Sequence, residues 1–257
     1  MQWKMIGTMT LVMAGWSLGG CGATASDKKL LAQGFADYEA HRVDEAQAAA
    51  TKFIEKNLNA ENLDEAYYLR GLTEFTKGDR PGAAQDLQIA IGKSKREDLK
   101  GKSYGILGEM AFNGQRWEQA LDYFKSTLEC YPAGQAPVAV YFRIGATLQA
   151  MGQWEKARPY LDRAIALKPD AVMLQRAIQR RNATSFALQY GAYKEGPRAR
   201  EAADQLRAAG INSMIASEMR EGQLLFMVRS GSYRTFDEAD FARQQLVAKY
   251  PLVTVVP

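Results

Sequence analysis

A pattern with a period of 37 residues runs through the first two thirds of the chain. Glycine and alanine recur at this interval, as Gly34, Gly71, Gly108 and Gly145 and as Ala46, Ala83, Ala120 and Ala157. The pairs Trp117 and Trp154, and Pro132 and Pro169, keep the same spacing. A small residue in each of two helices lets them approach closely, and a proline ends the unit. The period therefore predicts a solenoid of stacked helix pairs.

The third and fourth copies resemble the tetratricopeptide repeat. The third fills that pattern with Tyr104, Leu107, Gly108, Ala120, Phe124 and Pro132, and the fourth with Tyr141, Ile144, Gly145, Ala157, Leu161, Ala164 and Pro169. The first two copies have Leu58 and Lys95 where proline is usual, and the period exceeds that family's ~34 residues. The resemblance implies four repeats in residues 28–169, and a capping helix and linker in residues 170–183.

A solenoid of this kind offers a concave groove to proteins or peptides. By the family pattern, the first helices place these residues in a protein-binding groove: Phe35, Tyr68, Leu72 and Phe142. The aromatic residues Tyr38, Phe75 and Phe112 fall one position past the usual core aromatic, so either location suits them. An aromatic stripe at helical spacing also forms an ordinary core. Both interpretations stay open at the level of sequence.

The last third of the chain repeats one strand–turn–helix unit after a shift of 40 residues. Residues 186–193 align with residues 226–233, and Gly191 aligns with Gly231. Helices are expected from Ala199 to Ala209 and from a capping box at Thr235. A polar strand pair around residues 221–222 links the halves, and residues 252–256 form a closing strand. The order βαββαβ predicts a split-βαβ domain over residues 184–257, and the whole chain is α+β.

Two strand motifs in this domain resemble the sporulation-related repeat, or SPOR domain. They are Leu188-Gln-Tyr-Gly-Ala-Tyr193 and Phe226-Met-Val-Arg-Ser-Gly-Ser-Tyr233, and Leu206-Arg-Ala-Ala-Gly-Ile211 matches the helix exit. SPOR domains bind septal peptidoglycan, in particular glycan strands stripped of stem peptides. The resemblance therefore implies a wall-binding module and a partner that is a glycan strand.

Strand alternation predicts which side chains face away from the two helices. If Leu188 and Val228 face the helices, Gln189 and Arg229 stand side by side on the open face. Their amide and guanidinium groups suit sugar hydroxyls and acetamido groups. Alternatively, this face is only solvated, as antiparallel sheets allow. The predicted glycan-binding residues are Ala187, Gln189, Ala192, Tyr193, Leu225, Met227 and Arg229.

Two positions depart from the SPOR pattern. Met227 stands where the family has an arginine in the third strand, and Ser230 replaces a hydrophobic residue. Because methionine lacks the five donors of a guanidinium, either Arg229 takes over this role or glycan binding is weakened.

The first 20 residues form a predicted secretory signal, with Lys4 ahead of the apolar run of residues 5–18. It ends in Leu18-Gly-Gly-Cys21, which resembles a bacterial lipobox. That resemblance implies a lipid anchor on Cys21 and a tether over residues 21–27. By Gram-negative sorting, Gly22 after the cysteine implies the outer membrane, facing the periplasm. Cleavage after Ala25 is the alternative, and it would leave a secreted periplasmic protein.

Chemistry-bearing residues are few. The chain has one histidine, His41, which argues against histidine triads and multi-histidine metal sites. After removal of the signal and lipidation, Cys130 is the one remaining thiol, and we expect it to be a small buried group. No phosphate-binding loop and no carboxylate pair are evident, so we expect no enzyme activity, no cofactor and no metal site. A net charge of +4 without a basic cluster does not favour nucleic acid.

Two function hypotheses follow. In the first, the protein is an envelope lipoprotein whose SPOR domain binds denuded glycan strands at division sites and whose repeats recruit envelope or division proteins. In the second, it is a scaffold for an outer-membrane or secretion assembly, with a degenerate SPOR domain that binds protein. RNA binding by a βαββαβ sheet conflicts with export and lacks stacking aromatic residues on the open face.

Overall fold

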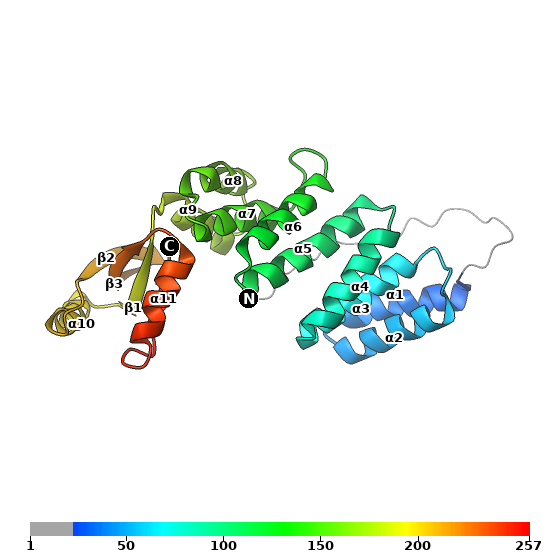
Figure 1. The fold of residues 1–257 in the computed structure, drawn as a ribbon, viewed down its shortest axis with the longest axis horizontal. Helices are drawn as coiled ribbons and strands as arrows, with labels where there is room; N and C mark the ends of the chain where they lie inside the picture. Colours follow the sequence, from blue (N-terminus) through cyan, green and yellow to red (C-terminus); the bar gives the residue numbers. More distant parts are fainter. Residues whose placement is uncertain (1–22, 221) are drawn as a thin grey trace.

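A computed structural model of the chain describes residues 23–220 and 222–257 (Figure 1). It contains a helical array followed by a small four-stranded sheet with helices, which confirms the predicted α+β class. In this part of the chain, no helix is long and apolar enough to cross a membrane. The array comprises α1 (Ala25–Glu39), α2 (Val43–Lys56), α3 (Leu63–Lys77), α4 (Arg80–Lys93), α5 (Glu97–Asn113), α6 (Trp117–Glu129), α7 (Val138–Ala150), α8 (Trp154–Ala166) and α9 (Ala171–Asn182).

Each repeat is one antiparallel helix pair whose contact is set by the recurring glycine of its first helix. A methyl group at Gly108 of α5 would come within 2.5 Å of the Phe124 ring, and one at Gly145 within 2.7 Å of Leu161. The alanines of the second helices, Ala46, Ala83, Ala120 and Ala157, have no exposed surface. The period of 37 residues therefore arises because the same close helix–helix contact recurs in each of the four repeats.

The array begins earlier than the sequence suggested. We predicted a tether over residues 21–27, but α1 starts at Ala25. Thr24 and Asp27 form a capping box, in which each side chain accepts from the other residue's backbone N–H. This satisfies two of the backbone donors that the first turn leaves free, and the sequence interpretation had overlooked it.

The C-terminal domain contains β1 (Phe186–Tyr193), α10 (Gly196–Ala208), β2 (Ser213–Arg220), β3 (Gln223–Tyr233), α11 (Phe236–Leu246) and β4 (Thr254–Val256). The strand order is β2-β3-β1-β4, so β1 and β3 are the central neighbours, as predicted. On one face of the sheet, Val228 packs in a core with Ala199, Ala203 and Leu206 of α10. The capping box predicted at Thr235 is present at the start of α11.

Two tryptophans of the array hold the C-terminal domain. The indole N–H of Trp117 donates to Asp237 Oδ1 at 2.9 Å, and that of Trp154 donates to the carbonyl oxygen of Arg234 at 2.8 Å. The rings also form a chain in which Trp117 packs on Phe236, Phe236 on Phe186 and Phe186 on Trp154, with centroids 5.0–5.9 Å apart. The helix α7 contacts α11 at the same seam. The array and the domain are therefore packed against each other.

Ion pairs join successive helices of the array, and beside one of them a carboxylate oxygen is buried without a hydrogen bond in the described residues. Arg70 of α3 binds both oxygens of Asp86 on α4, at 2.5 and 2.9 Å. Glu74 lies 3.9 Å from the same guanidinium, and its Oε2 is buried without a hydrogen-bond partner in the described residues. Burial, together with the nearby Asp86 carboxylate, raises the pKa of Glu74 to about 7.

We predict that replacing Gly108 by alanine destabilises the fold by about 1–3 kcal/mol, because the added methyl group overpacks the core. Gly92→Ala is the matched control, since a methyl group there meets nothing within 4 Å and alanine favours the helix by roughly 0.5–1 kcal/mol. Urea unfolding followed by circular dichroism measures both. Equal effects of the two substitutions would contradict the close-approach explanation.

A second prediction concerns pH. Because the pKa of Glu74 is about 7 in the folded chain and its ordinary value is 4.5, the folded state holds a proton that the unfolded chain releases. The free energy of unfolding should therefore fall as the pH rises between these values. Glu74→Gln should remove this pH-dependent loss of stability. The urea midpoint of the variant should therefore be higher than that of the wild type at pH 8 and equal to it at pH 4. A constant difference across this range would contradict the assignment. Glu118→Gln, at an exposed position, is the control.

Candidate functional site

The candidate glycan site lies on the sheet face opposite the α10 core. Gln189 of β1 and Arg229 of β3 are directly paired across the strands, as predicted. Arg229 Nε donates to Gln189 Oε1 at 3.2 Å, and its Nη2 lies 3.6 Å from Glu218 Oε2 on β2. The side chains of Arg229 and Glu218 are 20% and 21% exposed. Three strands therefore bring an amide, a guanidinium and a carboxylate together on a partly accessible surface.

Sequence reasoning missed Glu218. Its position follows from the tight β2–β3 hairpin at Gly222, which has a positive φ of 76°. That turn places Glu218 opposite Leu225 and Met214 opposite Arg229. Counting strand positions outward from the polar pair around residues 221–222 would have found both residues. Met214 is 60% exposed, so the polar cluster lies beside apolar surface.

Two predicted site residues are not on the open surface. Met227 has no exposed surface, so the expectation that it faces a ligand is wrong. Tyr193 packs against the α10 core instead of facing the open side. For Tyr193, the reason is a β-bulge in β1 between Gln189 and Gly191, which shifts the register and reverses the alternation beyond it. Tyr193 is consequently paired with Phe226, and Ala192 with Met227.

The remaining predicted residues differ in exposure. Ala192 is exposed, whereas Ala187, Gln189 and Leu225 are half-buried. Ser230 is buried, and its hydroxyl lies 3.0 Å from the hydroxyl of Tyr190, so the polar group in this unusual position has a partner.

The end of the array touches one edge of this sheet. The Gln175 side-chain amide on α9 donates to the carbonyl oxygen of Met219 on β2 at 3.0 Å. The contact is at the outer strand, and Gln189 and Arg229 both keep solvent access. The array therefore leaves the paired amide and guanidinium partly open.

The predicted protein-binding groove is only partly present. Tyr68 and Phe142 are buried, at 7% and 8% exposure, so their assignment to the groove surface is wrong. Tyr68 stacks on Phe35 with centroids 6.4 Å apart, and burial raises its pKa above the ordinary value. The guanidinium of Arg180 on α9 lies over the Phe142 ring at 5.8 Å. Packing of adjacent helices covers both rings, while Phe35 and Leu72 stay half-buried.

A polar contact between α5 and α7 also escaped the sequence analysis. Arg143 binds both carboxylate oxygens of Glu109, at 2.5 and 2.7 Å, and its guanidinium lies 4.7 Å from the Phe112 ring centroid. Glu109 is 5% exposed, and burial raises the pKa of its carboxyl group, opposed by Arg143. The spacing of 34 residues, close to one repeat, is the sequence signal that could have suggested the pair.

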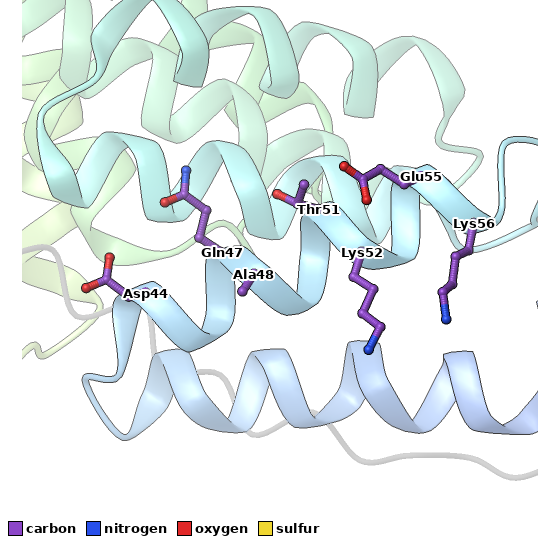
Figure 2. A pocket seen from close by; sticks show the side chains of 7 residues that line it. All are labelled: Asp44, Gln47, Ala48, Thr51, Lys52, Glu55 and Lys56. Carbon is purple, nitrogen blue, oxygen red and sulfur yellow. The ribbon is translucent and has the colours of Figure 1, made fainter.

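A shallow depression follows α2 and is lined by Asp44, Gln47, Ala48, Thr51, Lys52, Glu55 and Lys56 (Figure 2). Figure 2 shows Lys52 and Lys56 pointing away from Glu55, so charges of both signs are spread along the helix instead of converging. Lys77 of α3 binds Asp44 and Gln47 at one end. In the described residues, no group of three or more histidine, cysteine or acidic side chains is arranged to hold a metal ion.

Comparisons with protein families divide the chain into three segments. Residues 182–257 match the SPOR domain, residues 100–170 match the tetratricopeptide repeat, and residues 23–101 match a family described as outer membrane lipoprotein. The matched segments together span both the array and the C-terminal domain.

Individual relatives are distant. The crystal structure of MamA protein is 18% identical, covers 90% of this chain and 98% of its own, and has a TM-score of 0.50, which reports a shared fold alone. A thermophilic TPR protein of Thermus thermophilus is 21% identical over 71% of this chain and 89% of its own, with a TM-score of 0.44. The CTR9 homolog of Arabidopsis thaliana is 27% identical over 127 residues, and the match spans 48% of this chain but only 11% of that protein.

Proposed function

Taking the chain as a tetratricopeptide-repeat protein with a C-terminal SPOR domain, we propose that it is a cell-envelope lipoprotein that binds denuded peptidoglycan glycan strands, at division sites. Its repeats recruit envelope or division proteins. The matched families are binding or scaffold modules, and the proposal includes no catalytic step.

The observation that carries the proposal is the pairing of Gln189 with Arg229 on the open sheet face. The amide offers both a donor and an acceptor, and the guanidinium offers donors in a fixed plane, which suits hydroxyl and acetamido groups. Exposed Met214 adds an apolar surface beside them, on which a sugar ring face can lie. Arg229 performs the role that the SPOR family gives to the position of Met227, which is buried here.

The anchor in this proposal is a lipid on Cys21, which lies outside the described residues. The cap of α1 supports it, because cleavage before Cys21 keeps Thr24 and its capping box, whereas cleavage after Ala25 removes the capping residue. Loss of such a cap costs about 1 kcal/mol. The match of residues 23–101 to an outer membrane lipoprotein family agrees with an outer-membrane location facing the periplasm.

A second candidate function has its own observation. The outer strand β2 carries two exposed apolar side chains, Met214 and Met219, and Met219 lies opposite the exposed Leu224 of β3. A protein strand could add to such an edge. In this alternative, the chain is a scaffold of an outer-membrane or secretion assembly, and its SPOR domain binds protein instead of glycan.

Sedimentation with isolated sacculi tests the first function. We predict that the full chain co-sediments more with amidase-stripped than with untreated sacculi. Arg229→Ala should weaken this binding roughly tenfold or more, since a hydrogen bond from a charged group contributes about 1.5–3 kcal/mol. Gln189→Ala should weaken it less, because its amide is neutral.

Arg207→Ala provides the matched control, because Arg207 is an exposed arginine on α10 that pairs with Asp204. It should bind like the wild type. Two outcomes would refute glycan binding by this face and favour the scaffold function. In one, the full chain does not co-sediment with stripped sacculi; in the other, the Arg207 and Arg229 variants bind equally well.

Metabolic labelling with radioactive palmitate tests the anchor. We expect label on the wild-type chain and none on Cys21→Ser, because the thiol carries the diacylglyceryl group. Cys130→Ser should be labelled like the wild type. An unlabelled wild-type chain that is recovered from the soluble periplasm would contradict the anchor.

A further inference from the structure

A cavity of about 190 Å³ lies at the seam between the array and the C-terminal domain. Its walls include Phe112 and Trp117 from the array and Phe186 and Phe236 from the domain. Arg180 of α9 also lines it. Pockets for drug-sized ligands measure ~300–1,000 Å³, so this one suits a small molecule or the end of a larger one. Its aromatic walls favour an apolar group of about one side chain.

Arg180 is the charged residue in the wall of this cavity. Of the charges nearby, Arg143 is paired with Glu109, both of whose oxygens face it, and Asp237 accepts from the indole of Trp117. In the part of the chain that the structure describes, Arg180 forms no ion pair with a carboxylate. The hydrogen bond that its guanidinium donates there goes to Gln149 Oε1 at 3.0 Å, which leaves other N–H groups of the guanidinium for a ligand.

Arg180 is half-buried, and a charge that is partly removed from water without an ionic partner is less stable than one that is paired. Burial first, and repulsion from Arg143 second, lower the pKa of Arg180 to about 10, so the guanidinium is still charged at neutral pH. Phe142 beneath it contributes a cation–π contact but no negative charge. An anion would supply the missing charge, and carboxylates match the planar guanidinium.

We infer that the seam cavity binds a small monocarboxylate with an apolar body, with Arg180 holding the carboxylate and the aromatic side chains of both domains enclosing the rest. This inference does not depend on glycan binding, because the open face of the sheet takes no part in it. Since both domains line the cavity, the occupant also strengthens their contact. Free small molecules and the C-terminal residue of a peptide share this chemistry.

Calorimetric titration of the full chain with three compounds tests the inference. Phenylacetate carries both features, phenylacetamide has the same shape without the charge, and acetate has the charge without the ring. Phenylacetate should bind at least about tenfold more tightly than either of the other two. It should also raise the melting temperature, because it binds only the folded chain. Equal binding of phenylacetate and phenylacetamide, or no binding of phenylacetate, would overturn the inference.

Substitutions on α9 give an independent test. Arg180→Gln keeps a donor for Gln149 but removes the charge, and it should weaken phenylacetate binding at least about tenfold. Arg181→Gln is the control, because Arg181 is the adjacent arginine, is not among the residues that line the cavity, and pairs with Asp162. Unchanged binding to a folded Arg180→Gln chain would refute the role of Arg180. If that variant does not fold, the comparison of the three compounds on the wild-type chain still tests whether the cavity binds a carboxylate.

A competition experiment distinguishes a free small molecule from a peptide C-terminus as the ligand. The competitor is the tripeptide Gly-Gly-Leu, with either a free or an amidated C-terminus. Displacement of phenylacetate by the free form but not by the amidated form would identify a peptide end as the ligand. Displacement by neither, with phenylacetate bound, would identify a free small molecule. Displacement by both forms to the same extent would contradict a carboxylate site.

Discussion

Two indole N–H groups, one repeat apart, join the helical array to the C-terminal domain. Trp117 and Trp154 occupy equivalent turns of the third and fourth repeats, and each donates to the segment at which α11 begins. Each such bond contributes about 0.5–1.5 kcal/mol, and each aromatic pair beside it a similar amount. Because the two donors are separated by the repeat spacing, they fix the orientation of the domain as well as its position.

That orientation decides which parts of the C-terminal domain stay accessible to solvent. It leaves the face with Gln189 and Arg229 partly open, although α9 touches the edge of the sheet through Gln175. It also forms the seam cavity, whose walls come from both domains. A glycan on the sheet and a partner on the array would therefore be held at a fixed separation.

Sequence periodicity predicted the repeated elements of the fold and the contacts between neighbouring elements. It predicted the helix pairs from their glycines, the duplicated domain, and the juxtaposition of Gln189 with Arg229. It failed where tertiary packing determines the orientation and exposure of a side chain. One β-bulge turned Tyr193 to the helix side, and neighbouring helices covered Tyr68 and Phe142. The paired tryptophans were visible as a repeat feature, but their partners are 80 or more residues away in the chain, so their role could not be read from local pattern.

The most direct test of this account is the distance distribution between spin labels on the two domains. Labels at Gln88 of α4 and Asp204 of α10, both exposed, can be measured by pulsed electron resonance after serine replaces the native cysteines. The account predicts one narrow distribution for the otherwise wild-type chain, and a broad one when Trp117 and Trp154 are both changed to alanine. A broad distribution in the presence of both tryptophans would contradict it.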